Sequence, residues 1–245
     1  MRSNRNLEVV PAILAKSEEE FREKLRVIER VAPLVQIDVM DGAFVPNTTW
    51  ADPLVVAQIR TPTHFEVHLM VKEPFREVIL WGKLKNVRRT IVHAESTQQL
   101  RTLLHAIRAT GKQVGLAVNP GTPLQKIYPS LERPRLPRPR SARARNDVGV
   151  GVDFILIMSN DPGFSGRPFR SATLKRITAL RKRFPRLPIG VDIGVNTSTA
   201  PLLRRAGATH IAAASSIFTN ENPTAAYRAL QHAFGVTEKN RARKH

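Results

Sequence analysis

The stretch VQIDVMDG, residues 35–42, places an aspartate inside an apolar run that ends at a polar turn. Similar runs recur along the chain, at residues 8–14, 35–40, 65–71, 90–94, 113–119, 153–159, 188–194 and 210–216. Each is short and mostly apolar, without the strict alternation of a half-exposed antiparallel sheet. The pattern therefore predicts parallel strands that are buried on both faces.

Helix signals occupy the stretches between these runs. The clearest is SEEE, residues 17–20, a capping serine and an acidic first turn that precede apolar residues at helical spacing. Further helices are expected at residues 98–110, 171–184 and 224–234. Alternating strands and helices over this length predict the α/β class and a single (β/α)8 TIM barrel. A doubly wound open sheet shares this alternation and is the alternative fold.

The domain organisation follows from length and composition. A chain of 245 residues with 42% hydrophobic content matches one barrel, which we place at residues 1–236. An Arg/Pro-rich loop is expected at 133–150, because its prolines exclude a helix, and a basic tail at 237–245. This loop precedes the sixth strand, so in a barrel it belongs on the face opposite the active site.

The charge and the residue usage exclude several classes of function. The formal net charge of +19 allows contact with polyanions, but no aromatic residues are interleaved with the arginines, which makes nucleic acid an unlikely partner. Cysteine is absent, so disulfides and thiolate chemistry are excluded. No apolar run reaches the ~18 residues of a membrane span, and a cytoplasmic location is expected.

Charged side chains inside apolar strands indicate the candidate site. Asp38 lies in the second run, His68 in the third and Asp192 in the seventh. Barrel active sites collect at the carboxyl ends of the strands, and a buried carboxylate without a partner is costly. We therefore expect these side chains to share a cation or a substrate.

Glycines in the later loops indicate a phosphate site. DPGFSG, residues 161–166, follows the sixth strand, Gly194 follows the seventh, and Ser215 lies at the eighth. Glycine lets backbone N–H groups approach an anion closely, and the last loops of a barrel are its usual phosphate site. We therefore predict that a phosphate group binds between these loops, at the carboxyl ends of the last strands.

The chain resembles the ribulose-phosphate 3-epimerase family. The motifs that carry the resemblance occur in order as PAIL (11–14), IDVMDGAFVPN (37–47), EVHLMV (66–71), AVNPGTP (117–123), DPGFSG (161–166) and SSIF (215–218). The resemblance implies a TIM barrel, a divalent metal ion, and an isomerase that interconverts D-ribulose 5-phosphate and D-xylulose 5-phosphate.

The resemblance also implies roles for individual residues. Asp38 and Asp192 match the pair of catalytic acid/base residues. The implied metal ligands are Gln36, Asp38, His68 and Asp192. The implied substrate-binding residues are Met40, His68, Met70, Met158, Gly163, Gly166, Gly194 and Ser215.

Some residues depart from the family pattern. Gln36 replaces a histidine, and a neutral amide oxygen favours Mn, Fe(II) or Mg over Zn. Ala12 replaces a serine, while Ile193 and Ala214 replace glycines. These changes leave two alternatives open: an epimerase for another phosphorylated ketose, or a catalytically impaired barrel whose basic loop and tail bind polyanions. The expected partner is a sugar phosphate. The sequence is also compatible with assembly into a homo-oligomer.

Overall fold

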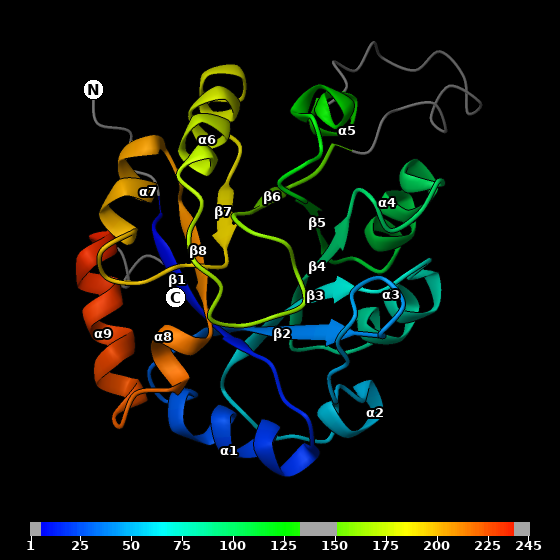
Figure 1. Cartoon of the computed structure of the whole chain (residues 1–245). Helices are drawn as coiled ribbons and strands as arrows, with labels where there is room; N and C mark the ends of the chain where they lie inside the picture. The colour runs from blue at the N-terminus through cyan, green and yellow to red at the C-terminus, as the bar shows by residue number, and fades with distance from the viewer. Residues whose placement is uncertain (1–5, 133–150, 238–245) are drawn as a thin grey trace.

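Eight parallel strands pair in chain order and close into a barrel, with β1 against β8 (Figure 1). The structure is a computed structural model that describes residues 6–132 and 151–237. The strands are β1 (Glu8–Ile13), β2 (Leu34–Met40), β3 (His64–Met70), β4 (Val87–His93), β5 (Gln113–Val118), β6 (Phe154–Met158), β7 (Ile189–Asp192) and β8 (His210–Ala213). The predicted TIM barrel is confirmed, and the open sheet is excluded.

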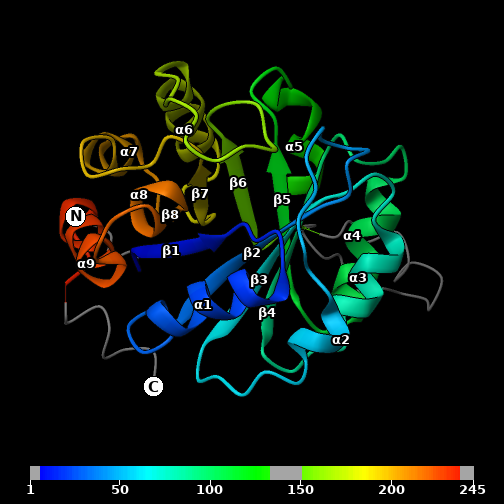
Figure 2. The same ribbon diagram turned by 60° about the horizontal axis from the view of Figure 1, so that its bottom comes forward.

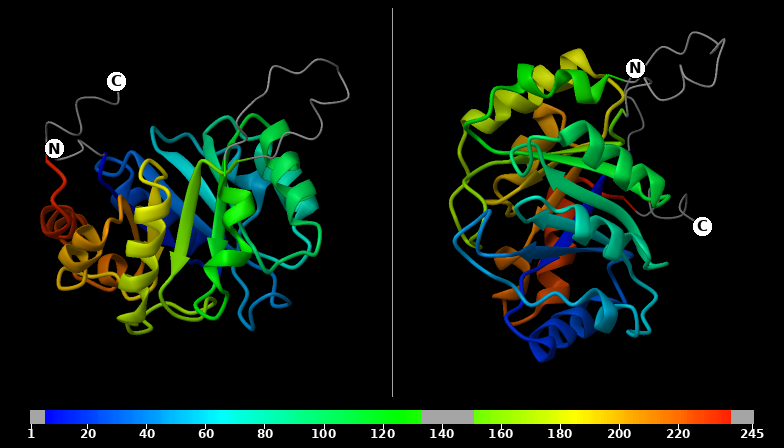
Figure 3. Two further views of the ribbon diagram at one scale, coloured as in Figure 1. Left: turned by 90° about the horizontal axis from the view of Figure 1, so that it is seen from above. Right: turned by 90° about the vertical axis from the view of Figure 1, so that its right-hand side faces the viewer.

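Helices surround the strands on the outside of the barrel, as the views from three further directions show (Figures 2 and 3). They are α1 (Glu18–Ile28), α2 (Pro53–Val56), α3 (Phe75–Gly82), α4 (Leu100–Ala109), η1 (Leu124–Lys126), α5 (Tyr128–Leu131), α6 (Ala172–Arg183), α7 (Ala200–Ala206), α8 (Ser215–Phe218) and α9 (Pro223–Phe234). None of those in the described part of the chain is long and apolar enough to cross a membrane.

The start of α1 shows how local sequence sets these elements. The Ser17 side chain accepts a hydrogen bond of 3.2 Å from the Glu20 backbone N–H, as the predicted cap requires. Phe21, Leu25 and Ile28 lie on one face of α1 and are buried. Their spacing is that of a helix packed on a sheet, so burial of this face holds α1 against the barrel.

Buried side chains pack together in the barrel interior. Ile91, Phe154, Leu156 and Met158 are buried together inside the strands. Gly190 makes room for the Phe154 ring, because a Cβ at this glycine would lie 2.4 Å from Phe154 Cζ. The packed interior separates the two ends of the barrel.

The predicted element ends are wrong at the last strand. The expected strand 210–216 stops at Ala213, because Ser215–Phe218 forms α8. The Arg/Pro-rich segment 133–150 and most of the tail lie outside the described residues. Their assignment as a loop and a tail, and with it the domain boundaries, therefore stays a prediction.

Candidate active site

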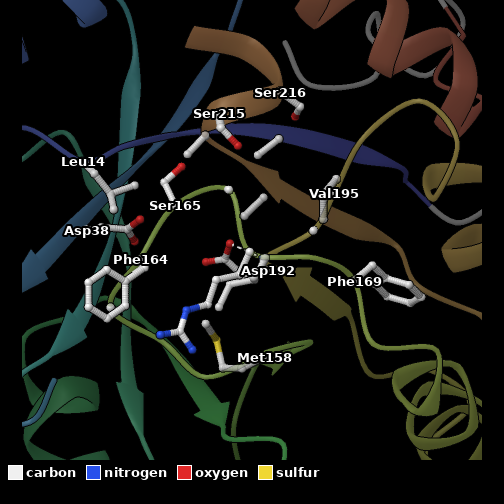
Figure 4. Close-up of a pocket in the computed structure, with 18 of the residues that line it drawn as sticks. Leu14, Asp38, Met158, Phe164, Ser165, Phe169, Asp192, Val195, Ser215 and Ser216 are labelled. Atoms are coloured by element: carbon white, nitrogen blue, oxygen red, sulfur yellow. Dashed lines mark hydrogen bonds between the residues drawn. The ribbon is translucent and has the colours of Figure 1, made fainter. Parts of the chain in front are cut away.

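A cavity of about 300 Å³ opens at the carboxyl ends of the strands (Figure 4). Most of the predicted site residues line it, namely Asp38, Met40, Met70, Met158, Gly163, Gly166, Asp192, Gly194 and Ser215. Gln36 and His68 are fully buried and are not part of the lining. They contact the two aspartates instead, so they reach the cavity only through these carboxylates.

Asp38 and Asp192 are joined by the side chain of Gln36. The Gln36 amide nitrogen donates to Asp38 Oδ1 at 2.8 Å and to Asp192 Oδ2 at 2.9 Å. Its carbonyl oxygen, Oε1, is buried and has no hydrogen-bond partner among the described residues. A single amide therefore holds carboxylates from β2 and β7 side by side, at the cost of an unsatisfied acceptor.

His68 contacts the same pair from β3. Its Nδ1 lies 2.9 Å from Asp38 Oδ1 and 3.7 Å from Asp192 Oδ2. One ligand atom from each of these three residues lies within 4.8 Å of the other two. An imidazole and two carboxylates this close form a group that can hold a metal ion.

Burial shifts the pKa values of Asp38, Asp192 and His68 in the directions that favour their uncharged forms. It raises the pKa of Asp38 to about 7, against the lowering effect of the Gln36 hydrogen bond. Burial, followed by the charge of Asp38, raises the pKa of Asp192 to about 6. Burial also lowers the pKa of His68 to about 4. Carboxyl groups with pKa values near neutrality are suited to taking up and releasing protons.

Behind His68 lies a second histidine that the sequence analysis did not single out. His68 Nε2 and His93 Nε2 are 2.8 Å apart, and the two rings are stacked at 5.0 Å between centroids. His93 Nδ1 lies 3.6 Å from Glu95 Oε2. A signal was present, because His93 is a polar residue within an apolar run, as Asp38 is.

Ile193 places Asp192 through a strained backbone. Ile193 has a φ of 72°, in the left-handed region that β-branched residues rarely adopt. Its N–H donates to Asp192 Oδ1 at 2.7 Å, and its carbonyl oxygen accepts from the Ser159 hydroxyl at 2.7 Å. The strained peptide thus fixes one oxygen of Asp192, while Gln36 fixes the other.

The loop glycines on the cavity rim have conformational reasons of their own. Gly194 has a φ of 68°, and a Cβ there would lie 2.4 Å from the backbone nitrogen of Phe169. Gly166 also has a positive φ, at 79°. Both turns require glycine whether or not an anion binds, and they leave the backbone of the rim accessible from the cavity.

Arg167 is a further cavity residue that the sequence analysis missed. Among the described residues that line this cavity, it is the only basic one. Its guanidinium lies 4.8 Å from the ring centroid of Phe164 and 3.7 Å from an oxygen of Asp161. It directly follows the glycine-rich motif, so its position next to a predicted phosphate loop was a usable signal.

The chain is similar to known proteins over most of its length. The model of the "Ribulose-phosphate 3 epimerase family" matches residues 8–135 and 142–218. The cytoplasmic isoform of ribulose-phosphate 3-epimerase from Oryza sativa is 32% identical over 207 residues, covering 84% of each chain. The ribulose-phosphate 3-epimerase of Bacillus subtilis is 32% identical over 220 residues, covering 86% of this chain and 92% of the relative.

Solved structures show similarity of fold. The 3-hexulose-6-phosphate synthase of Salmonella typhimurium superposes with a TM-score of 0.66 at 12% identity, covering 93% of this chain and 98% of that one. Orotidine 5'-phosphate decarboxylase from Lactobacillus acidophilus gives 0.58 at 17% identity, covering 94% and 100%. The family match and the relatives confirm the resemblance seen in the motifs: the chain belongs to the ribulose-phosphate 3-epimerase family, a family of isomerases.

Proposed function

We propose that this protein interconverts D-ribulose 5-phosphate and D-xylulose 5-phosphate by two-base proton transfer at C3. The observation that carries the proposal is the pairing of Asp38 and Asp192. Both line one cavity, come from different strands, and are held by one Gln36 amide. Family membership supports the choice of substrate.

The reaction needs acid/base groups on two sides of one carbon. One aspartate removes the C3 proton, and the electrons of the broken C–H bond form the C2–C3 double bond of an enediolate, which leaves negative charge on the C2 oxygen. The other aspartate delivers a proton to the opposite face of C3, and the C2 carbonyl forms again. Carboxyl pKa values of about 7 and about 6 suit both roles near neutral pH.

The donor set around the aspartates fits a divalent metal ion. It combines two carboxylates with His68 Nδ1, and the orphaned Gln36 Oε1 adds an amide oxygen if the side-chain amide rotates by half a turn. The present orientation directs N–H groups at the carboxylates, whereas the rotated one directs an acceptor at them. A cation makes the rotated orientation favourable, and oxygen-rich ligation favours Mn, Fe(II) or Mg over Zn.

A metal ion held by Gln36, Asp38, His68 and Asp192 would stabilise the negative charge of the enediolate. His68 would offer Nδ1, which lies beside the two carboxylates, and its proton would then reside on Nε2. In that tautomer Nε2 would donate to His93 Nε2, which lies 2.8 Å away. His93 is therefore a positioning residue that fixes the ring and the tautomer of His68.

The remaining predicted residues would hold the substrate. Met40, Met70 and Met158 give the cavity a soft apolar wall next to the reacting carbons. Backbone around Gly163, Gly166 and Gly194, together with Ser215, forms the rim proposed to bind the phosphate group. His68, which the resemblance also assigned to the substrate, lies behind Asp38, so its influence would pass through that carboxylate.

The test is an assay of purified protein on D-ribulose 5-phosphate, with and without a chelator. Formation of D-xylulose 5-phosphate that falls with chelator and returns with added Mn²⁺ supports both the reaction and the metal. Turnover only of another ketose phosphate, or absence of turnover with every metal tested, contradicts the proposed substrate and favours one of the two alternatives given by the sequence.

A further inference from the structure

A second cavity, of about 850 Å³, opens at the other end of the barrel. Its lining includes residues at or just before the starts of strands, among them Glu8 of β1, Arg88 of β4, Gln113 of β5 and His210 of β8. The candidate active site lies at the carboxyl ends of the same strands. We call this second site the amino-end cavity; it shares no lining residue with the first.

The acidic residues that line the amino-end cavity have basic partners. Glu8 Oε2 lies 2.6 Å from His210 Nε2 and its other oxygen lies 3.9 Å from Arg88. Asp153 pairs with Arg108 at 2.7 Å. Arg108 offsets the charge of Asp153, and Arg88 offsets that of Glu8. His210 holds Glu8 as an uncharged hydrogen-bond partner, because its pKa lies well below the usual value.

Arg89 also lines the amino-end cavity, and its side chain is buried. Its guanidinium donates to Glu66 at 2.7 Å, and both side chains are almost fully buried. The guanidinium also lies 3.9 Å from the Phe154 ring centroid, inside the barrel. This pair is neutral overall, so it gives the cavity a rigid polar base without adding net charge.

Further basic residues line the same cavity. Lys112 and Arg186 form no ion pair with a carboxylate among the described residues. Lys112 donates to the Leu84 carbonyl oxygen at 2.6 Å, which orients its ammonium group but leaves the charge in place. Arg181 also donates to backbone carbonyl oxygens, including that of Gly207 at 2.8 Å. The lining thus carries more basic than acidic side chains.

Burial and the positive charges of the lining together lower the pKa of the His210 ring. The pKa of His210 lies well below its usual range, first because of burial and then because of the positive charges of Arg89, Arg88 and Arg181. These arginines come from β4 and α6, and they act on one residue of β8. Positive charges from two elements therefore lie close to His210.

The neighbouring sequence does not complement this charge. The Gly151 carbonyl, at the edge of the described chain, accepts a hydrogen bond of 2.8 Å from Arg108 in the lining. The segment that precedes it, 133–150, contains six arginines and one aspartate. A segment of like charge is a poor occupant, so an anion from outside the chain is the better match.

We propose that the amino-end cavity binds a compact diphosphate or polyphosphate anion, held by Lys112 and Arg186. Arginine and lysine side chains converging on one concavity are the usual recognition elements for phosphate groups. The cavity has the size of a small-molecule site, and no Phe, Tyr or Trp is among the described residues that line it, so it lacks the usual platform for stacked bases.

The test is calorimetric titration of the full-length protein with pyrophosphate, and with orthophosphate for comparison. The double variant Lys112→Ala/Arg186→Ala should bind pyrophosphate at least about tenfold more weakly than the unmodified protein, because it loses two charge-assisted contacts. Arg26→Ala/Arg228→Ala, which removes two exposed basic residues of α1 and α9, is the charge-matched control and should bind as the unmodified protein does.

Two further variants decide where the anion binds. Arg186→Glu changes an exposed side chain, so it should leave the fold intact and weaken pyrophosphate binding. Ser215→Asp places a carboxylate at the proposed phosphate rim of the other cavity, so it should weaken anion binding there and leave pyrophosphate binding at the amino-end cavity unchanged. The proposal is overturned if Ser215→Asp abolishes binding while the Lys112 and Arg186 variants retain it, or if the charge-matched control weakens binding equally. Absence of pyrophosphate binding at low salt overturns it as well.

Discussion

Gln36 donates a hydrogen bond to Asp192 at 2.9 Å, although the two residues are 156 positions apart in the chain. The same nitrogen donates to Asp38, so one neutral amide connects both proposed bases. A metal ion between the carboxylates would compete with this amide, because both interact with the same oxygens. Binding of the metal would therefore require the Gln36 amide to rotate.

This competition predicts that Gln36→His binds zinc more tightly, by roughly tenfold or more, because imidazole is a better zinc donor than an amide oxygen. Zinc titration of both proteins measures the difference. Gln36→Leu is the matched control, since it removes the amide without adding a ligand, and it should not reach the affinity of the histidine variant. Unchanged or weaker zinc binding in Gln36→His contradicts the assignment of residue 36 as a metal ligand.

The backbone of Ile193 predicts a difference between two small residues. At a φ of 72°, alanine is strained and glycine is not, so Ile193→Gly should be more stable than Ile193→Ala by about 1 kcal/mol. Denaturant unfolding of both variants gives the difference. In the exposed, helical position of Ala229 the order should reverse, with Ala229→Gly less stable than the unmodified protein by about 1 kcal/mol. If Ile193→Gly is less stable than Ile193→Ala, as glycine is relative to alanine at position 229, the backbone of Ile193 is not strained.

The buried pair of Glu66 and Arg89 predicts a non-additive result. Arg89→Met leaves a buried carboxylate without its partner, which should cost about 3 to 5 kcal/mol of unfolding free energy. The double variant Glu66→Leu/Arg89→Met removes both charges and should recover most of that loss. Denaturant melts of the single and double variants provide the cycle. Additive losses would show that the two side chains do not stabilise each other.

His210 predicts a loss of stability in acid. Its pKa is lowered in the folded protein, so below the usual value of 6.5 the unfolded chain binds more protons than the folded one. Stability should therefore fall as the pH drops from about 6.5 to 5. His210→Asn should reduce this slope by up to about 1.4 kcal/mol per pH unit, the value for one proton.

The control for His210 is His232→Asn, on the exposed surface of α9. Unfolding free energies of all three proteins, measured between pH 5 and 7, separate one buried histidine from the general effect of acid. A slope in His210→Asn equal to that of the unmodified protein would mean that His210 is protonated as readily in the folded state as in the unfolded one.

Much of the fold was predictable because its signals are local. Apolar runs located every strand to within a few residues, and the cap at Ser17 located α1. The site was predictable for a related reason: Asp38 and Asp192 are polar residues in apolar runs, and the barrel brings the ends of all strands together. Ser215 was assigned to a strand because the residues just before it, 212–214, are small and apolar, whereas it begins α8.

The rest depends on contacts that no local pattern contains. That the Gln36 amide faces two carboxylates follows from the register of β2 and from the closure of the barrel, which brings β7 near. The strain at Ile193 is a backbone property that an isoleucine does not suggest. The amino-end cavity gathers residues from distant strands and helices, and its lysine and arginines read as ordinary surface charge when taken one at a time.

The central claim is that Asp38 and Asp192 are the two bases of the epimerisation. Asp38→Asn and Asp192→Asn each keep the shape of the side chain but cannot shuttle a proton, so each should lower turnover by at least about 10²-fold while leaving the fold intact. Circular dichroism and thermal unfolding of each variant check the fold. His105→Asn, a substitution outside both cavities, is the control and should retain normal turnover.

The most direct measurement is incorporation of solvent deuterium at C3 of the sugar phosphate, followed by NMR in D₂O. The unmodified protein should place deuterium on C3 of the inverted product, because the proton removed on one face is replaced from the other. Each asparagine variant should form inverted, deuterated product at least about 10²-fold more slowly. Normal turnover in either variant, or inversion in the unmodified protein without any deuterium at C3, would contradict the two-base account.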